Sequence, residues 1–402
     1  MTYPRFYEQA MLPENPDYER ATARLVPLYD REGDVRSPFV RDYTRTLHCL
    51  AYRRLKHKTQ VFYNVGNDHI CTRMEHVSHV ESVSETIATS LGLSRELTRA
   101  ISLAHDLGHA PFGHKGERII NDLSKEYVGE SFWHERHGLR IVDHFEMLED
   151  DHGTYRPLDL TFAVRDGIIS HCGEVDENGI FPRSEQISLD DFVRPGLYQP
   201  STWEGCVVKI SDKIAYLGRD IEDALRLGIL SRGDKEKLSR IIKGDIANTT
   251  VLINDFVYDI CKNSSPERGI CLSDEMLAMM NEIKRFNYEY IYKSPELDTF
   301  DHYSELVISS LFKKLRDAYD PECPERTLAN LRANRRRGGE LCRSFADWLD
   351  RFCLFSPHPE YASAPMFSML ESAQIYCRAI IDYISGMTDS YAIKAFDELI
   401  SF

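Results

Sequence analysis

The stretch His105-Asp106-Leu107-Gly108-His109-Ala110-Pro111-Phe112-Gly113-His114-Lys115-Gly116-Glu117 decides how the rest of this chain is interpreted. It places three imidazoles and two carboxylates within thirteen residues, next to sequence with an apolar helical pattern. Gly108 and Pro111 predict a backbone bend there, which allows neighbouring His and Asp side chains to point into one cavity. The stretch therefore predicts a divalent metal ion beside a general base.

Two helices are predicted on the N-terminal side of this stretch. Residues 74–91 have apolar positions at helical spacing, with His76 beside the apolar stripe, and Gly92 is expected to end this helix. Ser94 is expected to cap a second helix, which delivers His105 and Asp106 at its C-terminal end. If that helix persists, His109 lies one turn after His105.

Helical patterns also cover most of the remaining chain, and strand signals are few. We expect an all-α fold with an N-terminal extension (1–40), a helical core that carries the site (41–235) and a C-terminal helical region (236–402). The basic run at residues 332–343, centred on Arg335-Arg336-Arg337-Gly338-Gly339, is interpreted as a linker between helices rather than an anion site. Helical patterns lie at residues 138–148, 160–171, 203–230, 283–292, 303–319 and 368–384, and residues 172–200 are predicted to form a long loop.

Composition narrows the class of protein. The 402 residues are 42% hydrophobic, which allows a large core, and the ten cysteines are scattered singly, which indicates reduced thiols. The formal charge of −15 argues against general nucleic-acid binding. Residues 1–24 lack an apolar run of the signal-peptide type, and no later segment is long enough to span a bilayer. We therefore expect a cytoplasmic protein without a membrane partner.

One local cluster of charge departs from this acidic balance. Six basic residues and a single acid lie between Arg41 and Gln60. Such a local positive field suits a small polyanion better than a nucleic-acid duplex, although a solvated helix face explains the same pattern. Both interpretations are kept open.

Asp212 begins a series of polar residues at helical spacing. Tyr216, Asp220 and Asp223 follow it at offsets of four, eight and eleven, so the four share one helix face. As a lone pattern this is typical of a solvated acidic face, but the apolar neighbours imply that the helix is buried. Unpaired buried carboxylates are costly, and a cation would relieve their repulsion.

His76, His105, Asp106 and Asp212 together offer two imidazoles and two carboxylates. This mixed ligand shell suits octahedral Mn, Mg, Fe, Ni or Co better than a closed tetrahedral zinc site. A metal ion there can polarise a phosphoryl oxygen and activate water, while a nearby His or Glu moves protons.

These residues resemble a known family, the deoxyguanosinetriphosphate triphosphohydrolase-like dNTP hydrolases of the HD-domain superfamily. The resemblance covers roughly residues 41–230, and blocks at residues 51–62 and 160–171 are also similar to the family. An isolated His-Asp pair is weak evidence, whereas an ordered set of blocks is specific. The three main blocks are Arg73-Met74-Glu75-His76, residues 105–114, and Asp212-Lys213-Ile214-Ala215-Tyr216.

The resemblance implies an all-helical HD domain with His76, His105, Asp106 and Asp212 as metal ligands. It also implies that His114 acts at the α-phosphate as base or nucleophile, with Glu117 as its orienting carboxylate and His109 beside them in catalysis. The implied reaction cleaves a deoxynucleoside triphosphate between the 5′-oxygen and the α-phosphorus and releases a deoxynucleoside and tripolyphosphate. By the same resemblance a dNTP effector and a homo-oligomer are expected.

The resemblance also implies a set of substrate-binding residues. Cationic and phenolic side chains would hold the phosphates in place of a glycine-rich phosphate loop, which this sequence lacks. The implied set is Arg73, Lys213 and Tyr216 for the phosphates, Asp220 for the sugar 3′-hydroxyl, Gln60 near the sugar, and His134, which is retained from the family pattern.

Two positions depart from the family pattern. Glu135 and His137 stand where the family commonly has Asn and Gln, whereas His134 and Arg140 match it. These changes place an acid and an additional imidazole near the expected pocket, which leaves the preferred base undetermined.

Two other functions remain as alternatives. A nucleotide phosphomonoesterase or phosphodiesterase of the same superfamily would often show a Lys after the His-Asp pair and a later Gly-Tyr-Pro signature, and this sequence has neither. A non-catalytic nucleotide-sensing protein would not need His114 and Glu117, both of which are present. We therefore expect a metal-dependent dNTP triphosphohydrolase.

Overall fold

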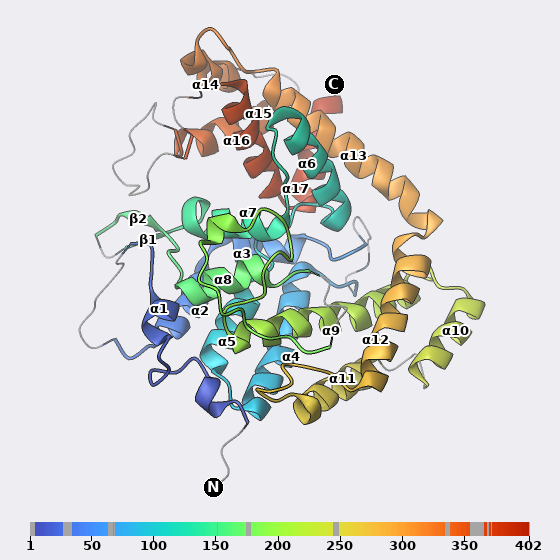
Figure 1. Ribbon diagram of the computed structural model, residues 1–402. Helices are drawn as coiled ribbons and strands as arrows, with labels where there is room; N and C mark the ends of the chain where they lie inside the picture. The colour runs from blue at the N-terminus through green and yellow to red at the C-terminus, as the bar shows by residue number, and fades with distance from the viewer. Residues whose placement is uncertain are drawn as a thin grey trace. The chain divides into compact units, whose positions relative to one another are not determined.

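The computed structural model describes residues 5–26, 34–62, 67, 69–150, 152–173, 178–243, 249–333, 338–353, 366–367, 370 and 372–401. Seventeen α-helices and one antiparallel pair of short strands are present in these residues (Figure 1). The predicted all-α fold class is confirmed. No helix of the described part combines the length and apolar character that crossing a bilayer requires.

The chain divides into two compact units that interleave along the sequence. The first unit contains Met1–Leu47, Val65–Asp106 and Asp159–Asp298, and the second contains His48–Asn64, Leu107–Leu158 and Thr299–Phe402. The linear boundaries expected near residues 40 and 235 stay a prediction. Each unit is described separately below.

The first unit is built around four mutually packed helices, α4, α5, α8 and α9, with α11 against α4 and α9. Their inward positions are apolar and fully buried, as with Val80, Ile101 and Val207. The helices of this unit are α1 (Tyr18–Thr22), α2 (Pro38–His48, which ends at the unit boundary), α4 (Arg73–Leu91), α5 (Arg95–Ala104), α8 (Phe162–Ser170), α9 (Trp203–Arg226), α10 (Arg232–Ile242), α11 (Thr249–Asn263) and α12 (Asp274–Asn287).

The ends of α4 and α5 follow the signals read from the sequence. Thr72 and Glu75 form a reciprocal capping box at the start of α4, and Gly92 ends this helix in a left-handed conformation. Ser94 caps α5 by accepting a hydrogen bond from the Leu97 N–H. These caps fix where the helices that carry His76 and His105 begin and end.

Close contact between α5 and α8 depends on a glycine. A Cβ atom added to Gly167 would lie 2.5 Å from Cγ2 of Ile101, so a larger residue would push the two helices apart. This contact places His171, which follows α8, beside His105, which follows α5.

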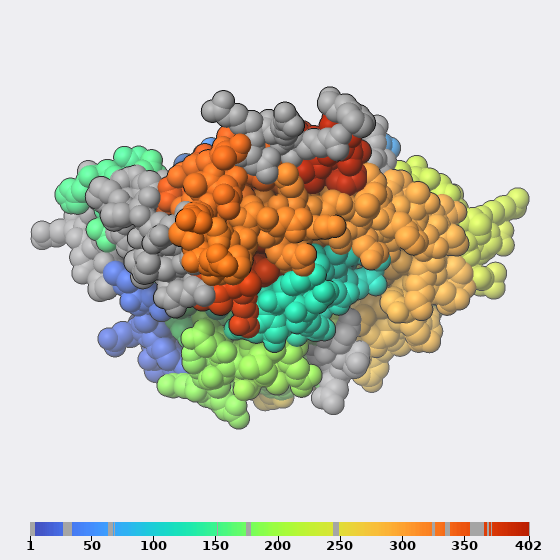
Figure 2. Space-filling view, turned by 90° about the horizontal axis from the view of Figure 1, so that it is seen from above, coloured from blue at the N-terminus to red at the C-terminus, as the bar shows by residue number. Residues whose placement is uncertain are grey.

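The second unit has its own apolar core, to which α6, α13, α15, α16 and α17 contribute. α6 packs on α16, and it also lies beside α13 on the face seen in Figure 2. The elements are α3 (Leu50–Arg54), α6 (Gly113–Tyr127), α7 (His134–Arg140), β1 (Met147–Glu149), β2 (Tyr155–Pro157), α13 (Pro295–Arg316, which begins at the unit boundary), α14 (Pro324–Ala333), α15 (Gly339–Asp350), α16 (Ala373–Ser385) and α17 (Asp389–Ile400).

Several helix boundaries differ from the sequence-based expectation. The helix that ends at Ala104 agrees with the predicted end at His105 and Asp106, and because residues 105–108 form a turn, His109 does not lie one helical turn after His105. The helical pattern at residues 138–148 corresponds to the end of α7, a π-helical turn at Ile141–Phe145 and the start of β1. In the described part of the long loop, residues 178–200, one 3₁₀ turn at Leu189–Asp191 is the longest helical segment. Residues 334–337 of the basic run lie outside the described residues.

Candidate metal centre and catalytic cluster

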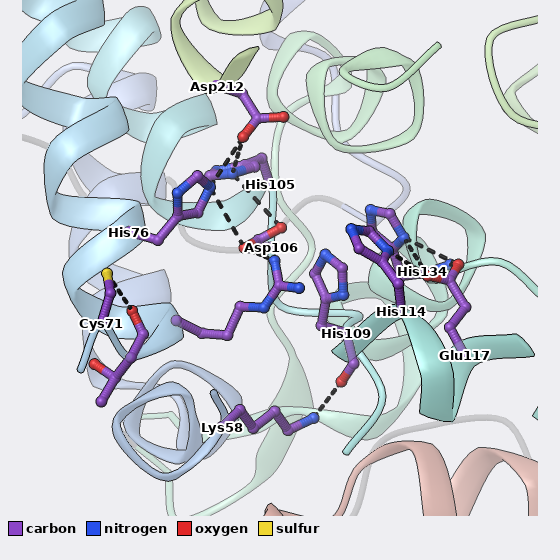
Figure 3. Close-up of polar contacts among 12 residues, drawn as sticks. Lys58, Cys71, His76, His105, Asp106, His109, His114, Glu117, His134 and Asp212 are labelled. Atoms are coloured by element: carbon purple, nitrogen blue, oxygen red, sulfur yellow. Dashed lines mark hydrogen bonds and ion pairs between the residues drawn. The ribbon is translucent and has the colours of Figure 1, made fainter. Parts of the chain in front are cut away.

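Four side chains of the first unit converge at the ends of α4 and α5 and on α9. His76, His105, Asp106 and Asp212 point toward one another in Figure 3. His76 Nε2 lies 2.9 Å from Asp212 Oδ1 and 3.9 Å from Asp106 Oδ2. His105 Nε2 lies 3.6 Å from Asp106 Oδ1 and 3.9 Å from Asp212 Oδ1. The structure thus brings together all four side chains that the sequence analysis assigned to a metal ion.

The orientation of His105 is set by its own helix. Its Nδ1 lies 2.6 Å from the Ser102 carbonyl oxygen, so Nδ1–H donates there and Nε2 carries the lone pair. His105 Nε2 is buried and has no hydrogen-bond partner among the described residues. A buried nitrogen lone pair that faces two carboxylates fits a metal ion, which would supply the missing partner.

The pKa shifts of Asp212 and His76 also favour a metal ion in this cluster. Burial raises the pKa of Asp212, but its hydrogen bond with His76 and the charge of His76 outweigh that effect and hold the pKa well below the usual range. Burial lowers the pKa of His76, and Asp212 and Asp106 more than reverse this. Without a cation the carboxylates are thus balanced by protons on histidine, which a divalent metal ion can replace.

Arg73 lies beside the cluster. At the N-terminus of α4, its guanidinium NH1 donates to Asp106 Oδ2 at 3.0 Å, and both side chains are buried. The family resemblance implies that Arg73 contacts the phosphates of a substrate, and in the structure its guanidinium lies next to Asp106, one of the four metal-ligand candidates. A phosphate bound at the metal centre would therefore have an arginine beside it.

One residue of this site was missed as a separate candidate. His171 is buried, its Nδ1 lies 2.7 Å from the Ile168 carbonyl oxygen, and its ring centroid lies 4.9 Å from that of His105. One ligand atom each of His171, His105 and Asp106 lies within 4.8 Å of the others. His171 reaches the site through the contact of α8 with α5 at Gly167, which is a long-range packing feature. The helical pattern at residues 160–171 does not encode that contact, so it gave only a weak signal for His171.

Three further predicted residues lie on α9, and two of them, Tyr216 and Asp220, share the helix face of Asp212. Lys213 and Asp220 are buried, and Tyr216 is half-buried. Asp220 Oδ2 accepts a short hydrogen bond from the Tyr292 hydroxyl, which follows α12 and was not predicted. Burial, together with the charge of Asp220, raises the pKa of Tyr292 well above its ordinary value, so the phenol stays protonated and donates to Asp220.

A second cluster, of imidazoles and a carboxylate, lies in the second unit. Glu117 on α6 accepts from the His134 backbone N–H at 2.8 Å and lies 3.0 Å from His134 Nδ1 (Figure 3). Its other oxygen lies 3.4 Å from His114 Nδ1. Burial raises the pKa of Glu117, but His134 and His114 outweigh it and hold the pKa well below the ordinary value. Glu117 is thus an anion shared between two imidazoles.

His114 and His109 occupy different environments in this cluster. The His114 side chain is 68% exposed, so its ring can reach a ligand and exchange protons. His109 is buried and stacks on His134 with ring centroids 3.8 Å apart. The structure therefore groups His109, His114, Glu117 and His134, all of which were assigned to catalysis or substrate binding.

The turn that carries His114 is held by a distant carboxylate. Phe112 has a positive φ of 61°, which is unusual for a residue other than glycine. Asp389, at the start of α17, accepts from the Phe112 N–H at 2.9 Å and from the N–H and hydroxyl of Thr59 at 3.0 and 2.7 Å. Gln60, the predicted sugar contact, follows Thr59 and is buried. Asp389 thus ties the Gln60 segment to the His114 turn.

The two departures from the family pattern are both buried on α7. Glu135 Oε2 lies 3.5 Å from His134 Nδ1 and has no hydrogen bond among the described residues. His137 lies two residues further along α7, with Nδ1 3.5 Å from Asp382 Oδ1. α7 itself is close to the turn at residues 105–108, since a Cβ atom on Gly108 would lie 1.9 Å from the His134 carbonyl oxygen.

Comparison with protein families agrees with this site. The HD domain matches residues 73–217, which include the four metal-ligand candidates, and a phosphohydrolase-associated domain matches residues 270–349 and 352–398. A helical domain with this His/Asp cluster therefore defines an HD-domain phosphohydrolase.

Curated relatives make the assignment narrower. Proteins named deoxyguanosinetriphosphate triphosphohydrolase-like include one from Caldanaerobacter subterraneus subsp. tengcongensis, 33% identical over 92% of this chain and 87% of the relative. Another, from Desulfatibacillum aliphaticivorans, is 33% identical over 83% of this chain and 90% of its own length. A third, from Nitrosomonas europaea, is 30% identical over 90% of this chain and 91% of the relative. The chain belongs to the deoxyguanosinetriphosphate triphosphohydrolase-like family.

Proposed function

We propose that this protein is a metal-dependent triphosphohydrolase that converts deoxynucleoside triphosphates into deoxynucleosides and tripolyphosphate. The observation that carries the proposal is the convergence of His76, His105, Asp106 and Asp212, with a buried lone pair of His105 facing the two carboxylates. The names of the curated relatives support the same reaction class.

The metal centre is proposed to bind the triphosphate. His76, His105, Asp106 and Asp212 would hold a divalent ion, which would supply Lewis-acid polarisation of a phosphoryl oxygen. Arg73, paired with Asp106 at 3.0 Å, adds a guanidinium whose donors suit phosphate oxygens. Lys213 and Tyr216 on α9 are proposed as further phosphate contacts, and Asp220 as the contact to the 3′-hydroxyl.

The second cluster is proposed to handle the proton and the attack at the α-phosphorus. His114 is exposed and acts there as base or nucleophile, while the Glu117 anion orients its ring and stabilises its protonated form. His134 shares the same carboxylate and is proposed to contact substrate together with Gln60. His109 supports His134 by stacking.

Product analysis tests this proposal. Purified protein is incubated with Mn²⁺ or Mg²⁺ and each dNTP, alone and in mixtures, and products are resolved by anion-exchange chromatography and phosphorus NMR. We expect tripolyphosphate and deoxynucleoside in equal amounts. No product is expected with excess EDTA or with the Asp106→Ala variant, whereas the exposed-site variant Asp190→Ala is expected to be fully active.

Other outcomes discriminate between the alternatives. Pyrophosphate or orthophosphate as the sole inorganic product would indicate a phosphodiesterase or phosphomonoesterase instead. Binding of a dNTP without turnover of any dNTP, alone or mixed, would indicate a nucleotide-sensing protein. Turnover that appears only in mixtures would support the expected dNTP effector. The homo-oligomer and the cytoplasmic location stay predictions.

A further inference from the structure

A cavity of about 480 Å³ lies entirely within the second unit. Its volume is in the range of small-molecule sites. Aromatic side chains form much of its wall: Trp348 has its ring centroid 5.3 Å from Phe145, 5.0 Å from Phe352 and 5.5 Å from Tyr383. Aromatic walls of this kind favour a planar ligand that can stack on them.

Both acidic groups in the wall are paired with a cation. Arg54 pairs with Glu146 at 2.7 Å, and Asp382 pairs with Arg140, whose Nε lies 3.1 Å away. With Arg351 of the lining, these groups sum to a single positive formal charge. A triphosphate carries close to four negative charges and needs more cations than this cavity offers. The small net charge favours an uncharged ligand over a triphosphate.

One polar atom in the wall lacks a partner. His137 is 2% exposed, and its Nε2 has no hydrogen-bond partner among the described residues, while Nδ1 faces Asp382. Burial lowers the pKa of His137, so the imidazole is neutral near pH 7. A buried polar atom without a partner is costly, and a ligand that presents an N–H or O–H group would satisfy it. A heterocyclic base or a sugar hydroxyl has such groups.

The cavity wall is continuous with the elements that hold the catalytic cluster of the same unit. His137 lies on α7 one turn after His134, which contacts Glu117. On another side the wall includes Thr388, which directly precedes Asp389, the residue that holds Phe112 and Thr59. A ligand in the cavity would therefore contact His137 and Thr388, which are close in the chain to the two residues, His134 and Asp389, that hold the segment around His114.

We propose that this cavity is a regulatory site for an uncharged nucleoside and that its occupation alters the His114 turn. The choice of a deoxynucleoside rests on the proposed function, since that reaction would release one. The binding itself does not depend on turnover.

Binding is tested on the full-length protein in EDTA, so that no metal-bound substrate mode contributes. Deoxyguanosine, deoxyadenosine and dGTP are compared by equilibrium dialysis and by tryptophan fluorescence. We expect saturable binding of one deoxynucleoside per chain and weaker binding of dGTP. His137→Leu should weaken nucleoside binding about tenfold through loss of one hydrogen bond, and Trp348→Leu should weaken it further.

Matched controls lie away from the cavity. His152→Leu, at an exposed turn of the same unit, and Trp203→Phe, in the first unit, should bind the nucleoside as the parent protein does. If Trp348→Leu does not fold, nucleoside binding by His137→Leu alone tests the proposal. The proposal is overturned if no saturable nucleoside binding occurs or if both cavity variants bind as tightly as the parent.

The effect on the His114 turn is measured without turnover. Imidazole Cε1–H signals are recorded by NMR and assigned by His114→Gln, and deoxyguanosine should shift the His114 signal in the parent but not in His137→Leu. Binding without this shift would refute the regulatory part. Failure of the proposed triphosphohydrolase reaction would appear separately, as the absence of tripolyphosphate, and would leave both of these measurements interpretable.

Discussion

At the scale of single residues, the assignment depends on which nitrogen of each histidine is available. His105 and His171 both commit Nδ1 to a carbonyl oxygen three residues earlier, so that Nε2 carries the lone pair in each ring. This arrangement is typical of metal-binding histidines, whose second nitrogen is fixed by a hydrogen bond. His114 differs from both because it is exposed and its Nδ1 faces a carboxylate.

Loss of the His114 side chain should therefore lower the catalytic rate without changing metal binding. We expect His114→Ala to bind Mn²⁺ as the parent protein does and to lose about 10²-fold or more in kcat, in the range of general acid–base groups. Calorimetric titration with Mn²⁺ and steady-state rates test the two parts. Full activity in this variant would remove His114 from the proposed mechanism, and the exposed-surface variant His152→Ala serves as the control.

His171 should act on the metal centre rather than on the second cluster. Its ligand atom lies within 4.8 Å of those of His105 and Asp106, so we expect His171→Ala to weaken Mn²⁺ binding by about 10- to 100-fold, as loss of a supporting residue does. Calorimetry and the Mn²⁺ EPR spectrum are the readouts. An unchanged affinity and spectrum would mean that His171 only packs against His105.

At the scale of elements, local signals predicted much of the fold. The capping residues Thr72 and Ser94 and the terminating Gly92 set helix ends where the sequence indicated them, because caps act through neighbouring residues. The helix that carries His105 ends at Ala104, close to its predicted end, and the condition that would place His109 one helical turn after His105 is not met. The turn there meets α7, and its close approach at Gly108 is a tertiary contact that helical periodicity does not encode.

The link between α17 and the His114 turn gives a prediction at this scale. Asp389→Ala removes the acceptor for the Phe112 N–H and for Thr59 and leaves a strained backbone without its support. We expect a loss of about 1–3 kcal/mol in the free energy of unfolding and a fall in kcat with unchanged Mn²⁺ affinity. Urea unfolding and kinetics test this against Asp347→Ala, an exposed site on α15.

The positioning role would be contradicted if the Asp389→Ala variant lost kcat only because a smaller fraction of its molecules is folded. A fall in Mn²⁺ affinity equal to that of a ligand variant would contradict it as well, since the contacts of Asp389 all lie in the second unit.

At the scale of the whole molecule, the chain passes repeatedly between two units, and one of these boundaries falls between Asp106 and Leu107. The sequence predicted four metal-ligand candidates, which the structure brings together, because those residue types are typical of that chemistry. It did not predict Tyr292 beside Asp220 or Asp389 beneath Phe112, which are 72 and 277 residues apart from their partners. Such contacts depend on the tertiary arrangement and leave no local pattern.

The free energy of unfolding should depend on pH through the titration of Asp223. Burial raises the pKa of this carboxyl from 3.8 to about 7, although the Cys71 N–H bond opposes the shift. The folded protein therefore binds a proton that the unfolded chain lacks between about pH 4 and 7. The contribution of Asp223 to the free energy of unfolding is therefore present at low pH and is lost as the pH rises through this range.

Asp223→Asn keeps an oxygen for the Cys71 N–H and removes this dependence. We expect the variant to exceed the parent by about 2 kcal/mol in free energy of unfolding at pH 8 and to show little difference at pH 4. Urea unfolding at both pH values measures this. A difference that is equal at the two pH values would argue that the carboxyl is not perturbed.

The central claim is that four side chains of the first unit bind one divalent ion, and a Mn²⁺ titration of metal-free protein tests it most directly. We predict one tightly bound Mn²⁺ per chain in the parent, and loss of that site in both His105→Ala and Asp212→Ala, with Asp190→Ala unaffected. Equal binding in the parent and in both ligand variants, or no binding at all, would contradict the account.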